Sequence, residues 1–250
     1  MIDVKSIEKI LNKIKDVDLK IRTDYKIDNH SVPRVTTILS SMIHEDGLMS
    51  WANSLGFRRI NYRGYLTEAA NKGTYSHLAI ERFLKYNEIP AMFDERYPIN
   101  IAPIVQSTFS AFYKWWEMLN RNHKVELVFS EEKLTHPYFG GTCDCVLKID
   151  GRYWLIDFKT SNHMNYKYTL QLGAYKYLLR HCKDIELGGC IVLILDKSTK
   201  NYYEYALDFS IKEHKDYIEL CTETFLVLAV AYRLRVLGQK EYKSIFDNIV

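Results

Sequence analysis

Two short apolar runs separated by a tight turn constrain the fold of this chain more than any other feature. The runs are residues 141–147 and 155–160, and the segment Ile149-Asp150-Gly151-Arg152 lies between them. Extended apolar segments on either side of an Asp-Gly pair are typical of a β-hairpin. Asp144 lies in the first run and Asp157 in the second, so the hairpin places two carboxylates on adjacent strands.

The second run also carries a lysine. Asp157 and Lys159 are two positions apart in an extended segment, so both side chains point to one face of the strand. Ile156 and Phe158 point to the other face. Paired carboxylates supply the oxygen ligands that Mg²⁺ prefers, and a neighbouring ammonium could stabilise the hydroxide that attacks phosphorus. The alternative is that Asp144 ends a turn, while Asp157 and Lys159 form an ordinary surface ion pair.

The composition is that of a globular protein. The 250 residues are 47% hydrophobic and 14% aromatic, enough for a packed core in one large domain or two small ones, which excludes a disordered chain. A net charge of +3 does not by itself indicate a nucleic-acid-binding surface. The chain has five cysteines without a CxxC pair, no signal-peptide pattern and no apolar run of membrane-spanning length. These features favour a cytoplasmic protein that does not contact a membrane.

Hydrophobic periodicity predicts helices before the hairpin and alternating strands and helices after it. Helices are expected at 2–19, 48–57, 62–70, 73–84, 104–119, 168–182 and 211–237, and further strands at 125–134, 189–195 and 202–207. The first helix is amphipathic and is expected to pack on the main body, with partner binding as the alternative. The last helix is expected to end at Gly238, with Arg233 and Arg235 in its final turns. This order predicts an α/β domain with a mixed central β-sheet flanked by helices and a helical N-terminal elaboration.

Two patterns make predictions about the core. Alternation in the strand 125–134 places Val125, Leu127 and Phe129 on one face. The aromatic helix 104–119 has one apolar stripe, and Trp115 lies off it. Such a stripe is expected to be core, with base stacking as the alternative.

A histidine in one of the predicted helices is a candidate ligand. Gly73, His77 and Glu81 are spaced four residues apart and therefore share one helix face. The small Gly73 would let another backbone or a ligand approach His77. A single histidine on a helix can also be a purely structural residue.

Polar residues of the N-terminal half are candidates for DNA binding. Thr36 and Thr37 lie where a loop enters a helix, and they could either cap that helix or bind phosphate. The basic residues that could line a substrate path are Arg58, Arg59, Arg63 and Lys72.

Together these residues resemble the RecB-like branch of the PD-(D/E)XK nuclease superfamily. The parts that carry the resemblance are Gly73 with His77, Glu131 or Glu132, Gly141-Thr142-x-Asp144, Asp157-x-Lys159 and Gln171-x-x-x-Tyr175. Two segments are most similar in sequence to the mitochondrial genome maintenance exonuclease and similar phage and bacterial exonucleases. They are Val35-Thr36-Thr37-Ile38-Leu39 and Asp157-Phe158-Lys159-Thr160-Ser161. The resemblance covers roughly residues 31–207.

The resemblance implies a restriction-endonuclease-like core at 73–207, in a single nuclease domain (1–250) with helical additions at 1–72 and 208–250. It implies Mg²⁺ or Mn²⁺ bound by His77, Asp144, Asp157 and the backbone carbonyl of Phe158. A histidine ligand tilts the preference toward Mn²⁺. Lys159 would orient or activate the attacking water, and Glu131 would support the site. Gln171 and Tyr175 would position substrate or the nucleophile.

Some members of this family hold an iron-sulfur cluster with four cysteines. The cysteines of this chain lack the usual distribution of that cluster around the nuclease core, so none is expected; they are Cys143, Cys145, Cys182, Cys190 and Cys221.

The implied activity is metal-dependent exonucleolytic hydrolysis of DNA, with single-stranded DNA as the substrate. One alternative is a structure-specific or nicking endonuclease on the same fold. Another is a catalytically inactive DNA-binding or scaffold protein, which a lost ligand would indicate. Every expected ligand and catalytic position is filled here, although the family proline before the first Asp is absent and Cys143 stands in its place. The sequence indicates no protein partner and no polarity of cleavage.

Overall fold

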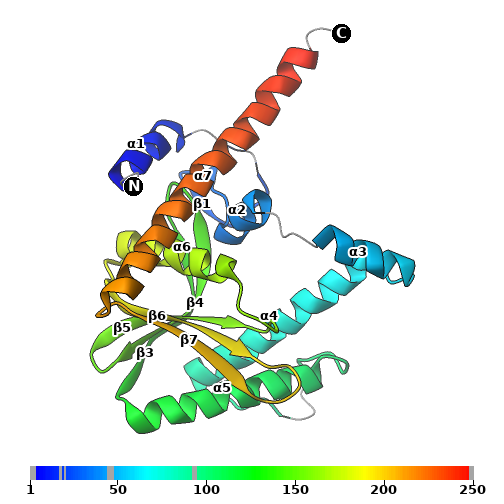
Figure 1. Cartoon of the computed structure of the whole chain (residues 1–250), viewed down its shortest axis with the longest axis vertical. Coiled ribbons are helices and arrows are strands. Elements are labelled where there is room, and N and C mark those ends of the chain that lie inside the picture. Colours follow the sequence, from blue (N-terminus) through cyan, green and yellow to red (C-terminus); the bar gives the residue numbers. More distant parts are fainter. Residues whose placement is uncertain (1–3, 17–18, 20, 44–47, 92–94, 248–250) are drawn as a thin grey trace.

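A five-stranded β-sheet forms the centre of the computed structural model, which describes residues 4–16, 19, 21–43, 48–91 and 95–247 (Figure 1). Its strands, in spatial order, are β3 (Val125–Thr135), β4 (Gly140–Ile149), β5 (Arg152–Lys159), β6 (Leu187–Leu195) and β7 (Tyr202–Asp208). Neighbouring strands are antiparallel except β5 and β6, which are parallel and are connected through helix α6 (Tyr166–Lys183). The mixed sheet expected from the sequence is therefore confirmed.

Helices cover both faces of this sheet. Helices α4 (Tyr62–Tyr86) and α5 (Ala102–Asn122) cover one face. The other face is covered by α6 and α7 (Lys212–Asp247), together with α1 (Val4–Ile14) and α2 (Val35–Met42). The remaining elements are α3 (Leu48–Phe57) and a small hairpin of β1 (Lys26–Ile27) and β2 (His30–Ser31). No helix in the described part of the chain combines the length and apolar character that a membrane crossing requires.

Each face of the sheet has its own hydrophobic core. The core under α6 and α7 includes Val146 and Leu155, and the core under α4 and α5 includes Leu147 and Ile156. Consecutive residues of β4 and β5 thus enter opposite cores, as the two-residue period of a strand requires. Helix α1 contributes Ile7 and Leu11 to the first core, which confirms that the amphipathic N-terminal helix packs on the main body.

The predicted hairpin forms with the expected turn. Asp150 and Gly151 have φ values of 48° and 84°, the left-handed conformation that a two-residue hairpin turn needs. The register pairs Ile149 with Arg152 and Cys145 with Ile156. The next positions toward the open end of this ladder are Asp144 and Asp157, so the two carboxylates lie side by side on adjacent strands.

Two predictions about the core were wrong. The pairing of β3 with β4 shifts between Leu127 and Phe129, so a bulge at Val128 moves Phe129 to the opposite core from Val125 and Leu127. Trp115 is only 2% exposed, because its indole also faces the core and its Nε1 donates to Glu204 on β7.

Three helix boundaries also differ from the sequence prediction. Helix α2 begins at Val35 after an N-cap at Arg34 that makes no side-chain capping bond, so neither threonine that follows is the cap. The helices expected at 62–70 and 73–84 are one continuous helix, α4. Helix α7 runs on through Gly238 to Asp247, and Arg233 is completely buried inside the protein, away from a helix end.

Candidate active site

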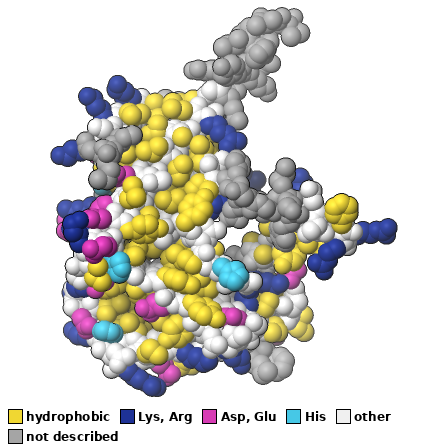
Figure 2. Space-filling view, viewed as in Figure 1, with side chains coloured by type: hydrophobic (Ala, Val, Ile, Leu, Met, Phe, Trp, Pro, Cys, Tyr) yellow, Lys and Arg dark blue, Asp and Glu magenta, His cyan; other side chains and the backbone are white. Residues whose placement is uncertain are grey.

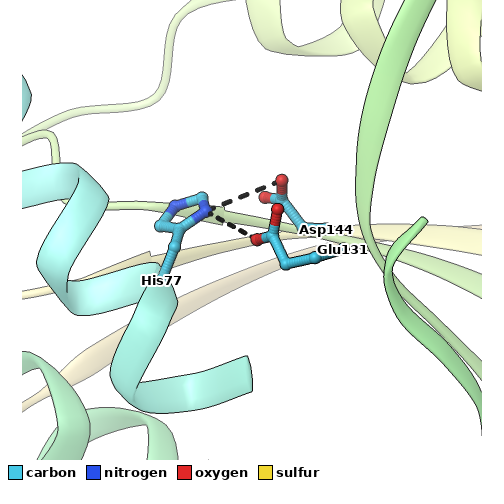
Figure 3. Close-up of side chains that lie close together, drawn as sticks. All are labelled: His77, Glu131 and Asp144. Atoms are coloured by element: carbon cyan, nitrogen blue, oxygen red, sulfur yellow. Dashed lines mark ion pairs between the residues drawn. The ribbon is translucent and has the colours of Figure 1, made fainter. Parts of the chain in front are cut away.

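Three side chains from three different elements meet beside the open end of the hairpin (Figure 3). His77 Nδ1 lies 3.5 Å from Glu131 Oε1 and 3.6 Å from Asp144 Oδ1. One ligand atom from each of the three lies within 4.8 Å of the others. A nitrogen and two carboxylate oxygens at this separation could hold one divalent cation.

Local backbone features bring these three residues together. His77 lies on α4 one turn after Gly73. A Cβ built on Gly73 would lie 3.7 Å from Thr160 Oγ1, so the helix passes close to the end of β5. Glu131 has a φ of 53° and lies between the paired residues Ser130 and Glu132, so it interrupts the ladder with β4. That irregularity turns Glu131 toward His77.

The structure also distinguishes the two candidate glutamates. Glu131 lies against His77, whereas Glu132 forms an ion pair with Lys183 on α6. The sequence left both open because adjacent residues of a strand point to opposite faces and the pattern did not show which face carries the site.

Asp157 is the most deeply buried acidic group of the site. Its side chain is 1% exposed, and neither oxygen makes a hydrogen bond with any described residue, although Lys159 Nζ lies 2.7 Å from Oδ2. Burial raises the pKa of Asp157 to about 6, against the lowering effect of Lys159. A buried carboxylate whose one close partner is a single ammonium is costly, because its other oxygen has no donor among the described residues. A bound cation would satisfy that oxygen, so the donor set fits a divalent metal.

Asp144 and His77 are both tied to the backbone of Phe158. The Phe158 N–H donates to Asp144 Oδ2 at 2.8 Å, and the Phe158 carbonyl lies 3.0 Å from His77 Nε2. Burial lowers the pKa of His77, but Asp144 and Glu131 outweigh it and raise the pKa to about 9. The three ligands and the carbonyl that the resemblance implied therefore lie in one small region.

Lys159 connects the carboxylates to helix α6. Its Nζ lies 3.2 Å from Gln171 Oε1 and 5.0 Å from the centre of the Tyr168 ring. Burial lowers the pKa of Lys159, but Asp157 and Asp144 outweigh it and raise the pKa above its ordinary value. Lys159 is therefore a fixed positive charge at neutral pH.

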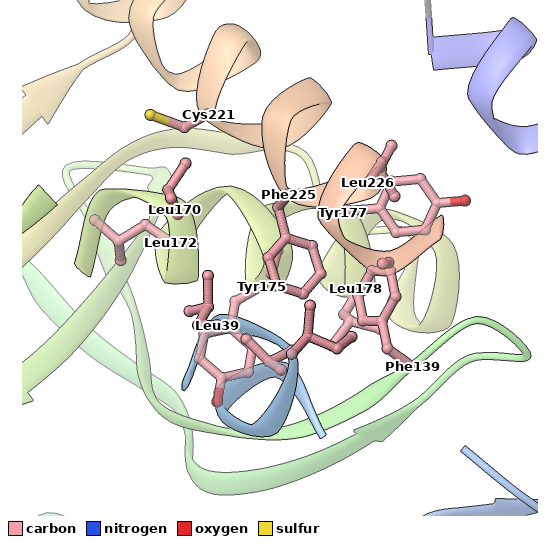
Figure 4. Close-up of a cluster of buried hydrophobic side chains, with 14 of the residues drawn as sticks. Leu39, Phe139, Leu170, Leu172, Tyr175, Tyr177, Leu178, Cys221, Phe225 and Leu226 are labelled. Atoms are coloured by element: carbon pink, nitrogen blue, oxygen red, sulfur yellow. The ribbon is translucent and has the colours of Figure 1, made fainter. Parts of the chain in front are cut away.

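Tyr175 closes the site from the side of the first core (Figure 4). It is 3% exposed, and a Cβ on Gly141 would lie only 2.6 Å from its Cε1. Burial, together with the nearby carboxylates of Asp144 and Asp157, raises the pKa of Tyr175 well above its ordinary value, so the phenol stays neutral. A glycine at position 141 is thus what allows the ring to reach the carboxylates.

The residues predicted to bind DNA are spread over a wider area. Thr36 lines a cavity of about 310 Å³ that also contains His77, Asp144 and Lys159, whereas Thr37 is not among the residues that line it. Lys72 lies on α4 in an ion pair with Glu68. Helix α3 and the start of α4 project from the body (Figure 1 and Figure 2). Three exposed basic residues lie in this projecting part: Arg58, Arg59 and Arg63. None of those three lines this cavity.

Sequence reasoning missed Tyr25 and Arg34, which form one wall of the cavity. The Tyr25 hydroxyl lies 2.7 Å from Oγ1 of Thr142, a residue of the predicted motif. Tyr25 precedes the β1–β2 hairpin, whose turn residues Asp28 and Asn29 both have positive φ. The Asp-Asn pair was the available signal, because these residues adopt that conformation more readily than most.

Comparison with known proteins gives a family for this arrangement. Residues 52–226, well over half of the chain, match the family model described as PD-(D/E)XK nuclease superfamily. No curated protein matches.

Two solved structures are similar at low identity. SSO0001 shares 14% identity, over 88% of this chain and 84% of that chain, with a TM-score of 0.32. A phage related exonuclease from Haemophilus somnus 129PT shares 10% identity, over 84% of this chain and 97% of that chain, with a TM-score of 0.36. TM-scores this low carry no argument about function.

Proposed function

Since the chain belongs to the PD-(D/E)XK nuclease superfamily, we propose that it is a DNA exonuclease that hydrolyses phosphodiester bonds with Mg²⁺ or Mn²⁺. The observation that carries the metal dependence is Asp157, a buried carboxylate whose one close partner among the described residues is the Lys159 ammonium, next to Asp144 on the adjacent strand. The metal would be held by His77, Asp144 and Asp157. Glu131 lies within 4.8 Å of the first two, and the Phe158 carbonyl lies 3.0 Å from His77 Nε2.

The chemistry divides between the metal and the protein. A bound divalent cation lowers the pKa of water and neutralises charge on the phosphate. Lys159, held between Asp157 and Gln171, orients the attacking water and stabilises the negative charge that develops. Gln171 fixes the direction of the ammonium, because its Oε1 accepts a hydrogen bond from Lys159 Nζ.

Two groups complete the surroundings of the reaction. The neutral hydroxyl of Tyr175 serves as a hydrogen-bond donor to the substrate or to the water. The first core, in which Tyr175 is embedded, excludes bulk water from that side of the carboxylates and so strengthens each electrostatic contact.

We further propose that the substrate is single-stranded DNA and that cleavage proceeds from an end. Both statements follow from the motif resemblance to the RecB-like branch. The test is a digestion series with end-labelled single-stranded and double-stranded DNA, with Mg²⁺, with Mn²⁺ and with EDTA. Metal-dependent release of short products from single strands, with slower release from duplexes, is the expected result.

Circular single-stranded DNA separates the exonuclease from the endonuclease alternative. An exonuclease leaves the circle intact while degrading the same sequence in linear form, whereas an endonuclease opens both. Binding of DNA without hydrolysis in either metal would favour the inactive scaffold instead. The complete set of site residues argues against that reading.

A further inference from the structure

Two cavities that differ in their basic residues flank the three candidate metal ligands. The first, of about 390 Å³, lies along α4 and is lined by Gly73, Thr74, His77, Leu78, Glu81 and Glu131. It contains two carboxylates and no lysine or arginine. The second is the cavity of about 310 Å³ described above, which also contains two carboxylates, Glu131 and Asp144, but adds Arg34 and Lys159. Both include His77 and Glu131, so the two cavities meet at the metal site, and lysine and arginine line only one of them.

Of the two basic groups in the second cavity, Arg34 is the one that the proposed reaction does not already use. Lys159 is held by Asp157 and Gln171 at the reacting phosphate. Arg34 pairs through Nη2 with Asp24, whose side chain is 75% exposed, and such surface pairs are weak. The Arg34 Nε is buried and has no hydrogen-bond partner among the described residues. The Arg34 side chain as a whole is 43% exposed, so a ligand can reach its guanidinium, and one of its donors is not satisfied by the described residues.

The position of Arg34 is fixed by Tyr25. The guanidinium lies 5.8 Å from the centre of the Tyr25 ring, and Lys133 Nζ lies 5.0 Å from the same centre. Tyr25 is 7% exposed and is anchored to Thr142 by its hydroxyl. It also packs against Gly140, where a Cβ would lie 2.5 Å from the ring. The ring thus holds Arg34 at the cavity wall, where its backbone bridges to Gly140 on the strand that carries Asp144.

We propose that Arg34 binds a non-scissile phosphate of the DNA, the one next to the phosphate that reacts, and releases Asp24 when it does so. Arginine suits this role because its fork of N–H groups matches two phosphate oxygens. The cavity along α4 has no lysine or arginine that could bind a phosphate, which leaves the Arg34 side for the charged backbone. This inference rests on the proposed nuclease function and makes Arg34 a substrate-positioning residue of the same site.

The test compares steady-state cleavage and DNA binding by Arg34→Gln and Asp24→Asn. Arg34→Gln is expected to raise KM by roughly 10- to 100-fold, the value of one charge-assisted contact, with kcat changed only a few-fold. Asp24→Asn is expected to lower KM by about two- to fivefold, because it removes the competing partner of Arg34. If Arg34 only held Asp24 in place, both variants would change KM in the same direction, and the proposal would be overturned.

A matched control and a modified substrate sharpen this result. Arg121→Gln changes an exposed arginine at the far end of α5 and should leave KM unaltered. A single methylphosphonate linkage, moved along a short oligonucleotide, should weaken cleavage by the wild type at one position beside the cleaved bond. Arg34→Gln should be insensitive to that same linkage. Equal sensitivity in both proteins contradicts the proposal.

Fluorescence anisotropy with EDTA separates this inference from the proposed function. If the oligonucleotide binds in an Arg34-dependent way but is not cleaved with either metal, the nuclease function is overturned and the Arg34 phosphate contact is kept. If the wild type cleaves DNA and neither binding nor KM depends on Arg34, the nuclease function is kept and the Arg34 contact is overturned. Thermal unfolding of each variant checks that the fold is intact.

Discussion

Gly141→Ala should disturb the active site without touching any charged group. The new Cβ would lie 2.6 Å from Cε1 and 3.0 Å from the hydroxyl oxygen of Tyr175. A carbon–carbon contact needs about 3.5 Å, so the ring must retreat by about 1 Å. Tyr175 is 3% exposed and packed in the first core, so this movement costs about 1–3 kcal/mol of unfolding free energy.

The same displacement should also reduce catalysis. A shift of about 1 Å in a positioning group can lower the rate roughly 100-fold. Denaturant unfolding gives the stability change, and initial rates on labelled DNA give kcat/KM. Gly56→Ala is the matched control, because Gly56 is exposed in α3 and a Cβ there meets no atom within 4 Å. That variant should be as stable as the wild type or about 0.5–1 kcal/mol more stable.

A double-mutant cycle identifies the ring as the cause. In a Tyr175→Phe background the ring remains, so Gly141→Ala should cost the same free energy as in the wild type. In a Tyr175→Ala background the clash is gone, and Gly141→Ala should cost less by about 1–3 kcal/mol. Equal costs in all three backgrounds, or a Gly141→Ala protein with normal stability and activity, would refute the reasoning.

Three other predictions test the fold around the site. Gly173→Ala places a Cβ 2.7 Å from the backbone nitrogen of Thr222, so α6 and α7 must separate and the unfolding free energy should fall by about 1–3 kcal/mol. Arg233 donates to the carbonyls of Pro137 and Tyr138 in the β3–β4 turn and of Ile14 at the end of α1, and Arg233→Met removes these donors. Chemical denaturation should show that the unfolding free energy falls by about 3 kcal/mol or more. Burial lowers the pKa of His136 to about 4, so as the pH falls below about 6.5 this histidine takes up a proton in the unfolded chain before it does so in the folded protein. The unfolding free energy should therefore fall between about pH 6.5 and pH 4. Because His136 is partly exposed, the fall in the wild type should exceed that in His136→Gln by only about 1–2 kcal/mol.

Much of the fold could be predicted from local sequence signals. The hairpin was predictable because Asp150-Gly151 specifies its turn and the apolar runs specify its register. Phe129 could not be placed, because a one-residue bulge reverses every side chain after it and leaves no mark in the apolar pattern. The end of α7 could not be placed either, since a glycine stops a helix only when the chain has another way to satisfy its carbonyls.

The site divides in the same way. Asp144, Asp157 and Lys159 were predictable from strand geometry, and the structure places all three together. His77 comes from a distant helix and was found through the family motif. Arg34 was missed because its place in the cavity depends on Tyr25 and on two adjacent strands, which are brought together only by the tertiary fold.

The most direct test of the central claim is single-turnover cleavage of labelled single-stranded DNA by wild type and Asp157→Asn in Mg²⁺ and Mn²⁺. The substitution keeps the shape of the side chain but removes the buried charge next to Lys159. We predict that EDTA abolishes cleavage by the wild type and that Asp157→Asn cleaves at least about 1000-fold more slowly. The circular dichroism spectrum of Asp157→Asn should match that of the wild type. Cleavage by Asp157→Asn at near the wild-type rate would contradict the assignment of this site.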